Sequence, residues 1–155
     1  MNKAASNLRT VMAPYRGGHL LLPGNVVAEV IDYAKPVPQE HGPPWLMGEL
    51  EWNSWQVPII SFAMLSELTS RDPAGAGSRI LILKTLAEKV SLYYIGILIN
   101  GLPKLKKINS DGIEKLDKKE DSAVVFCHAR LGEDEVVIPS LDELTKAVAA
   151  AVYDQ

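Results

Sequence analysis

Residues 48–62 have the sequence GELEWNSWQVPIISF, and this stretch decides the fold class. The apolar side chains fall on even positions in its first half (Leu50, Trp52) and on odd positions in its second half. A two-residue turn at Asn53 and Ser54 between two paired strands would produce this change of parity. Asn also tolerates the left-handed backbone conformation that such turns need. The stretch therefore predicts a β-hairpin.

Similar apolar or alternating segments, each of roughly four to eight residues, occur on both sides of this hairpin. Pro, Gly, Asn and Ser separate them, which is typical of an all-β domain built as small barrels or a sandwich. The predicted strands are Leu8–Met12, His19–Leu22, Leu46–Trp52, Gln56–Phe62, Arg79–Lys84, Leu92–Ile99, Ala123–Ala129 and Glu135–Ile138.

The C-terminal end has a different pattern. Ser140 followed by Glu143 has the spacing of a capping box, and apolar residues then recur at helical intervals. We therefore predict a helix over Leu141–Val152, and a shorter one over Phe62–Leu68.

Two stretches are predicted to connect these elements. Residues 71–78 (RDPAGAGS) are rich in Gly, Pro and Ala, and we expect an exposed, mobile loop. Residues 104–121 interleave both signs of charge with few apolar side chains. They predict a solvated connection rather than a binding face.

Length and composition restrict the class of protein. The 155 residues, 47% of them hydrophobic, predict one domain over residues 1–155 with a substantial core. The net charge is −3 with basic and acidic residues mixed, so we expect no nucleic-acid partner.

Cys127 has no second cysteine to pair with, which fits a reducing compartment. Apolar runs are too short for a signal peptide or a membrane span, so we expect a cytoplasmic protein without membrane insertion.

Residues that could carry catalysis do not converge in the sequence. Cys127 and His128 are neighbours and would point to opposite faces of a strand, so we expect Cys127 to be a small buried apolar residue. His19 and His41 lack partners at the spacing of metal ligands. The segment AGAGS (74–78) lacks the Lys of a phosphate loop. We therefore predict no enzyme activity, no cofactor and no metal site.

Two alternative functions remain open at this point. A small β-barrel could bind an oligonucleotide by stacking bases on Trp52, Trp55 or Tyr93, which would require a basic groove beside them. A small hydrolase could use Glu49 or Glu51, which would require a close pair of buried carboxyl groups.

Two segments resemble the chemotaxis coupling-protein (CheW-like) family. LLLPGNVVAEVI (20–31) is similar to the family's opening strand, Pro and V-x-E-V/I pattern, with Val27 and Glu29 in the matching places. GELEWNSWQVPIISF is similar without gaps to G-x-x-N-x-R-G-x-x-x-P-x-x-D-L, and Gly48 and Pro58 match its fixed points.

Two further segments follow in the family's order. INGL (99–102) resembles V-D-x-V, and VVIPSLDELTKAV (136–148) resembles the closing strand and helix. The chain also departs from the pattern, because Asn53 and Ser54 replace the family's Arg-Gly pair. The segment from Glu51 to Ser61 is similar to adaptors of twitching-motility pathways that control type IV pili.

The resemblance implies a fold and a role. The fold would be mainly β, with two intertwined SH3-like five-stranded barrels, an apolar groove between them and a C-terminal helix. The role would be a non-catalytic adaptor that couples the cytoplasmic tips of chemoreceptors to the regulatory domain of a chemosensory histidine kinase. The residues that the resemblance places at partner contacts are Val27 and Glu29 on one surface and Leu50, Trp52, Asn53 and Val57 on a second.

Overall fold

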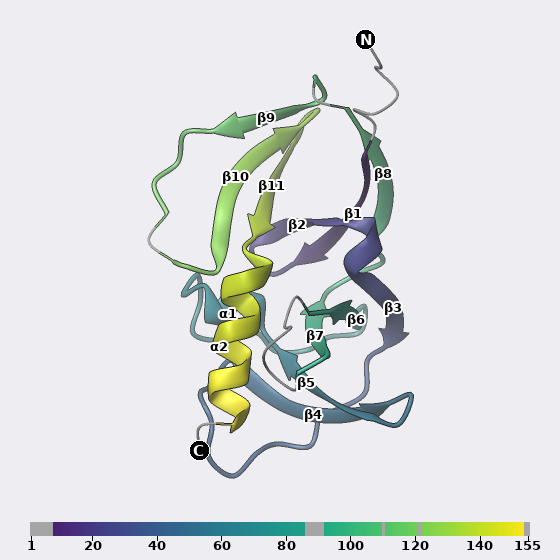
Figure 1. Ribbon diagram of the computed structural model, residues 1–155, viewed down its shortest axis with the longest axis vertical. Helices are drawn as coiled ribbons and strands as arrows, with labels where there is room; N and C mark the ends of the chain where they lie inside the picture. Colours follow the sequence, from purple (N-terminus) through teal and green to yellow (C-terminus); the bar gives the residue numbers. More distant parts are fainter. Residues whose placement is uncertain (1–7, 86–91, 110, 121, 154–155) are drawn as a thin grey trace.

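The computed structural model describes residues 8–85, 92–109, 111–120 and 122–153, which form two β-sheets and a C-terminal helix (Figure 1). The elements are β1 (Leu8–Tyr15), β2 (Gly18–Pro23), a 3-10 turn (Gly24–Val26), β3 (Val27–Asp32), β4 (Leu46–Trp52), β5 (Trp55–Ile60), α1 (Phe62–Leu65), β6 (Arg79–Lys84), β7 (Tyr94–Ile99), β8 (Lys104–Ile108), β9 (Ile113–Leu116), β10 (Val125–Leu131), β11 (Asp134–Pro139) and α2 (Leu141–Tyr153).

The chain begins in one sheet, crosses to the other and returns. Sheet A has the strand order β8-β1-β2-β11-β10-β9, and sheet B has the order β3-β6-β7-β5-β4. Strands β3 to β7 thus lie between β2 and β8 in sequence but form a separate sheet, which makes the two subdomains intertwined. The predicted mainly β fold with a C-terminal helix is confirmed, and sheet A has six strands within the described residues.

The apolar side chains gather in three clusters. One lies within sheet A around Met12, Leu21, Ile108, Ala129 and Val136. A second lies within sheet B around Val57, Ile59, Ile80 and Ile82. The third joins the two sheets and includes Tyr15, Leu20, Phe62, Leu81, Ile97, Leu144 and Val148. Because the third cluster takes residues from both sheets and from α2, its burial fixes the two subdomains against each other.

Helix α2 begins where the capping-box spacing predicts. The hydroxyl of Ser140 accepts a hydrogen bond from the backbone N–H of Glu143 at 3.3 Å. Leu144 and Val148 are buried on one face of the helix, against the cluster that joins the sheets. The polar face carries Lys146, which pairs with Asp142 at 3.1 Å.

The structure differs from the predicted elements in three places. The segment 104–121, predicted as a solvated connection, contains strands β8 and β9. Their side chains are mostly exposed, so they give no apolar pattern, and backbone pairing to β1 and β10 holds them instead. Strand β3 was not among the predicted strands, and none of its side chains is fully buried. Helix α1 ends at Leu65 rather than Leu68, and residues 71–78 are irregular as predicted.

Candidate partner-binding surfaces

The β4–β5 hairpin has the predicted two-residue turn. Asn53 and Ser54 have φ angles of 48° and 67°, and Trp52 lies directly opposite Trp55. Left-handed backbone at both turn residues is the geometry of a tight hairpin turn, which matches the right-handed twist of its strands. Asn53 and Ser54 are both exposed at the tip.

Glu29 and Trp52 meet across sheet B, although the resemblance assigns them to different surfaces. The indole Nε1 of Trp52 donates a hydrogen bond to Oε1 of Glu29 at 3.0 Å. Glu29 belongs to β3 and Trp52 to β4, the two end strands of this sheet. The bond therefore closes the sheet towards a barrel and brings together one residue from each predicted contact set.

The Trp52 ring belongs to a chain of four aromatic rings in contact. The ring centroids of Trp52 and Tyr94 lie 4.9 Å apart, and those of Trp55 and Tyr93 lie 5.1 Å apart. Trp55 also lies 5.4 Å from Tyr94. Trp55 and Tyr93 remain 42% and 52% exposed. Tyr94 was missed in the sequence, and the pair of adjacent tyrosines directly before the apolar run 95–99 is the signal that could have revealed it.

Two of the predicted contact residues belong instead to the interior of sheet B. Val57 is fully buried, and Leu50, directly opposite on β4, is half-buried against the same cluster. The side chain of Val57 is therefore part of the interior in the free chain, and its contact with a partner remains a prediction. It shares the inward-facing parity of Ile59, whereas only Trp55 at the end of that row reaches the surface.

An open groove of about 820 Å³ lies between sheet A and the segment that leads into β3. We call it the β1–β8 groove; its lining includes apolar Leu8, Val11, Val27 and Leu105 and basic Arg9, Lys106 and Lys107. Leu105 is 86% exposed and Leu8 is 53% exposed. Val27 is the only residue of the predicted contact set that lines this groove, and the basic residues were missed because β8 was predicted as a connection.

A second exposed apolar feature lies on the other side of sheet A. The pairing of β10 with β11 shifts between Val125 and Cys127, which leaves Phe126 in a bulge and 72% exposed. Strand β9 pairs with β10 only from His128 onward, so the edge of β10 before His128 has no described strand beside it. A hollow of about 390 Å³ adjoins Phe126 and is lined in part by Leu116 and Cys127.

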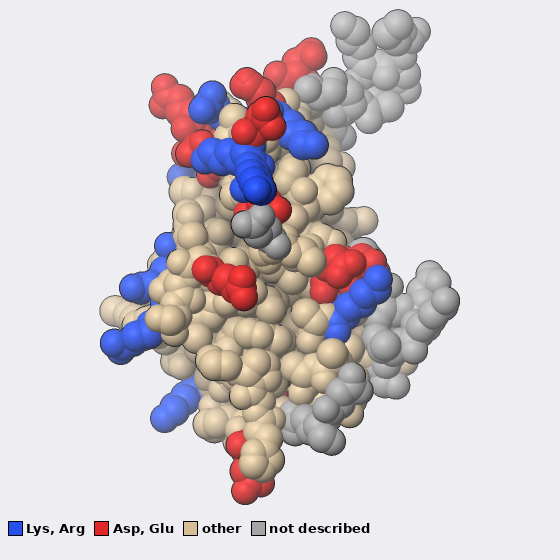
Figure 2. Space-filling view, turned by 90° about the vertical axis from the view of Figure 1, so that its left-hand side faces the viewer, with Lys and Arg blue, Asp and Glu red and all other residues tan. Residues whose placement is uncertain are grey.

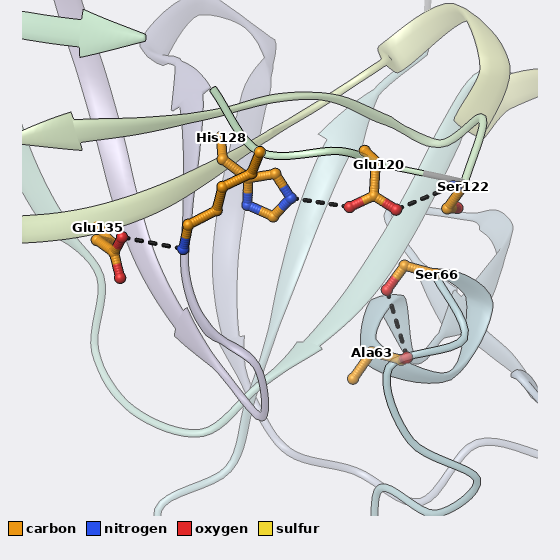
Figure 3. Close-up of polar contacts among 7 residues, drawn as sticks. Ala63, Ser66, Glu120, Ser122, His128 and Glu135 are labelled. Carbon is orange, nitrogen blue, oxygen red and sulfur yellow. Dashed lines mark hydrogen bonds and ion pairs between the residues drawn. The ribbon is translucent and has the colours of Figure 1, made fainter. Parts of the chain in front are cut away.

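Polar side chains hold the connection between β9 and β10 close to this edge (Figure 3). His128 Nε2 lies 2.8 Å from Glu120 Oε2, and the backbone N–H of Ser122 donates to Glu120 Oε1 at 2.9 Å. Burial, and then the negative charge of Glu120, raise the pKa of the Tyr15 hydroxyl to about 12.

The adjacent Cys127 does not join His128 in a catalytic pair. Cys127 lies opposite Ile138, which packs in the sheet A cluster, and His128 lies opposite Val137, which packs in the cluster between the sheets. The two side chains therefore point to opposite faces of β10, as predicted, although Cys127 is half-buried rather than buried.

Comparison with known protein families matches a model of the CheW-like domain to residues 10–148. The chain belongs to the CheW-like family. Members of this family are non-catalytic scaffolds, and the chain is accordingly an adaptor of chemosensory signalling rather than an enzyme.

The CheW-like fold is also found by comparison with solved structures. The chain is similar to the crystal structure of the scaffolding protein TtCheW from Thermoanaerobacter tengcongensis, with a TM-score of 0.74 and 18% sequence identity. The similarity covers 88% of this chain and 91% of that chain, and it supports the division into two SH3-like subdomains. No curated protein matches the sequence significantly.

The surroundings of the aromatic rings do not favour the nucleic-acid alternative for this CheW-like chain. Strands β3, β4, β5 and β7 contain no Lys or Arg, and of the two basic residues on β6 only Lys84 lies opposite one of the rings, that of Tyr94. Strands β3 and β4 carry acidic residues, including Glu29 and Glu51. Figure 2 shows basic and acidic side chains interleaved at the upper end of this face, with basic side chains along its left edge. A groove that binds phosphates would need cations beside the rings.

The hydrolase alternative is not supported either. Glu51 is exposed and Glu49 is only half-buried, so they do not form a close pair of buried carboxyl groups. Within the described ranges, no group of three or more His, Cys, Asp or Glu side chains could hold a metal ion.

Neither helix in the described part of the CheW-like domain is long and apolar enough to cross a membrane.

Proposed function

We propose that this CheW-like chain is a cytoplasmic adaptor that holds the tip of a chemoreceptor and the regulatory domain of a sensory histidine kinase. The observation that carries the proposal is the separation of two exposed apolar features on one domain. The β1–β8 groove borders one end strand of sheet A, and Phe126 lies beside the other. An adaptor that binds two partners at once needs two such surfaces.

The receptor side is the β1–β8 groove together with the neighbouring hairpin. Val27 lines the groove, and Glu29, two residues later, bonds to Trp52 beside Asn53. An apolar groove accepts the apolar face of a helix, which is the form that the resemblance gives to a receptor tip. Val27 in the groove and Glu29, Trp52 and Asn53 on sheet B are thus the candidate contacts of the receptor side.

The kinase side is the edge of β10 at Phe126. The resemblance implies a kinase domain of the same fold, and such domains can meet by edge strands and apolar side chains. The edge of β10 before His128, which has no strand beside it among the described residues, and the exposed phenyl ring of Phe126 provide both elements.

The kinase contact is tested by titrating the isolated regulatory domain of the host's chemosensory kinase into the purified chain. Because contacts of this kind are modest in area, we expect saturable binding with a Kd in the micromolar range, roughly. A receptor tip added afterwards should bind without displacing the kinase domain. If calorimetry detects no kinase binding at about 100 µM, the kinase half of the proposal is wrong.

We propose that the signalling pathway of this adaptor controls type IV pili. The segment from Glu51 to Ser61 supports this proposal, because it is similar to adaptors of twitching motility. Deletion of the gene from its host should abolish directed twitching, and the wild-type gene should restore it. Loss of swimming chemotaxis with normal twitching would contradict this assignment.

The tip of the β4–β5 hairpin provides a test of the receptor side. Asn53→Arg should change receptor affinity while leaving kinase affinity intact, because a charge at the rim of an interface alters specificity. Asn53 has a φ of 48°, so arginine there should also cost about 1 kcal/mol of stability.

The matched control is Asn53→Ala, which has the same backbone strain and no charge. A receptor effect seen with arginine and not with alanine, at equal melting temperatures, belongs to the interface. Unchanged affinity for both partners in both variants would show that Asn53 is only a turn residue.

A further inference from the structure

Two cations lie directly opposite each other in the β1–β8 groove, and neither has an acidic partner within the described part of the chain. Arg9 on β1 is paired in register with Lys107 on β8, so their side chains emerge on the same face. Like charges directly opposite on paired strands are destabilising. None of the ion pairs formed among the described residues includes Arg9, Lys106 or Lys107.

This concentration of positive charge is local. The whole chain carries a net charge of −3, yet the segment from Lys104 to Lys107 contains three lysines and no acid. Elsewhere on the described surface, Lys118 and Lys146 each have a carboxylate within 3.1 Å.

The floor of the groove between these cations is apolar. Val11 and Leu105 are directly opposite each other in the row next to Arg9 and Lys107, and Val27 lines the facing wall. Leu105 is 86% exposed, so its side chain lacks a described apolar partner over most of its surface. A groove with an apolar floor and a basic rim is complementary to a helix with an apolar face and acidic residues along one flank.

We propose that the β1–β8 groove selects an amphipathic helix whose carboxylates pair with Arg9 and Lys107 while its apolar side chains pack on Val11, Val27 and Leu105. The proposal deepens the proposed function, because the helix is then the receptor tip. The chain's own helix cannot take this place in a second copy, since the apolar face of α2 is buried in the core.

Charge reversal at Lys107 tests the proposal through two opposite effects. Lys107→Glu places a carboxylate opposite Arg9, so the free protein should melt at the same or a slightly higher temperature. The same change should weaken binding of the receptor's cytoplasmic tip at least tenfold and reduce the salt dependence of that affinity. Lys107→Gln should have a smaller effect on receptor affinity and on its salt dependence. Lys35→Glu, at an exposed lysine outside the groove, should leave both quantities unchanged. Equal affinity and salt dependence in wild type and Lys107→Glu would overturn the proposal.

A second experiment tests the preference of the groove for a helix with acidic residues, which we call the charge rule, separately from the assignment of that helix to the receptor. Two synthetic helices share one apolar face and carry either Glu or Lys along its flank. We expect the Glu helix to shift the NMR signals of Val11, Val27 and Leu105 and the Lys helix to leave them unchanged. If the Glu helix binds and the receptor tip does not, the receptor assignment fails and the charge rule stands. If both helices bind equally, or neither binds, the charge rule is wrong.

Discussion

Replacing Gly48 with alanine should lower the free energy of unfolding by about 3 kcal/mol or more. Gly48 has a φ of 139°, a conformation that residues with a Cβ atom rarely adopt. An added Cβ would also overlap the carbonyl of Val37, which accepts a hydrogen bond from Glu49 N at 2.9 Å. This contact is backbone, so it cannot yield by a rotamer change, and the Val37–Glu49 bridge would have to open.

Gly75→Ala is the matched control, because a Cβ at Gly75 would meet no atom within 4 Å. We expect that change to alter stability by less than about 0.5 kcal/mol in chemical denaturation. A Gly48→Ala variant as stable as Gly75→Ala would show that the bridge to Val37 contributes little. A large loss of stability in Gly48→Ala would explain in physical terms why Gly48 stands at a fixed point of the family pattern.

Elements whose side chains face a core could be predicted from the sequence. The β4–β5 hairpin was predicted because Trp52 and Val57 change parity around an Asn that accepts a positive φ. Helix α2 was predicted because Leu144 and Val148 recur on one buried face after a capping Ser140. In both cases the local pattern and the tertiary burial agree, which is the condition for such predictions to hold.

The candidate surfaces could not be predicted in the same way, because exposed side chains leave no periodic pattern. Strand β8 is held by backbone pairing to β1 while Leu105 points to solvent. The β1–β8 groove combines residues from β1, β3 and β8, which are distant in sequence. The Glu29–Trp52 bond likewise depends on the curvature of sheet B, which joins its two end strands.

The bulge in β10 illustrates the same limit at one residue. In VVFCHA (124–129) a regular alternation would place Phe126 on the face opposite Cys127. The register shift between Val125 and Cys127 instead places Phe126 outside the paired register. Bulges frequently redirect a side chain at a sheet edge, and here the result is a phenyl ring in solvent beside an unpaired edge.

Phe126→Ala should therefore weaken binding of the kinase regulatory domain by roughly 30-fold, or about 2 kcal/mol, as expected for a buried aromatic anchor of an interface. The ring is 72% exposed in the free chain, so its loss should change the melting temperature little. Tyr153→Ala is the matched control, because it removes an aromatic side chain that is 53% exposed on α2, away from the β10 edge. Receptor-tip affinity should be the same in wild type and both variants. If Phe126→Ala keeps kinase affinity within about twofold of wild type, the kinase does not use this edge, and an equal loss with Tyr153→Ala would point to a contact along α2 instead.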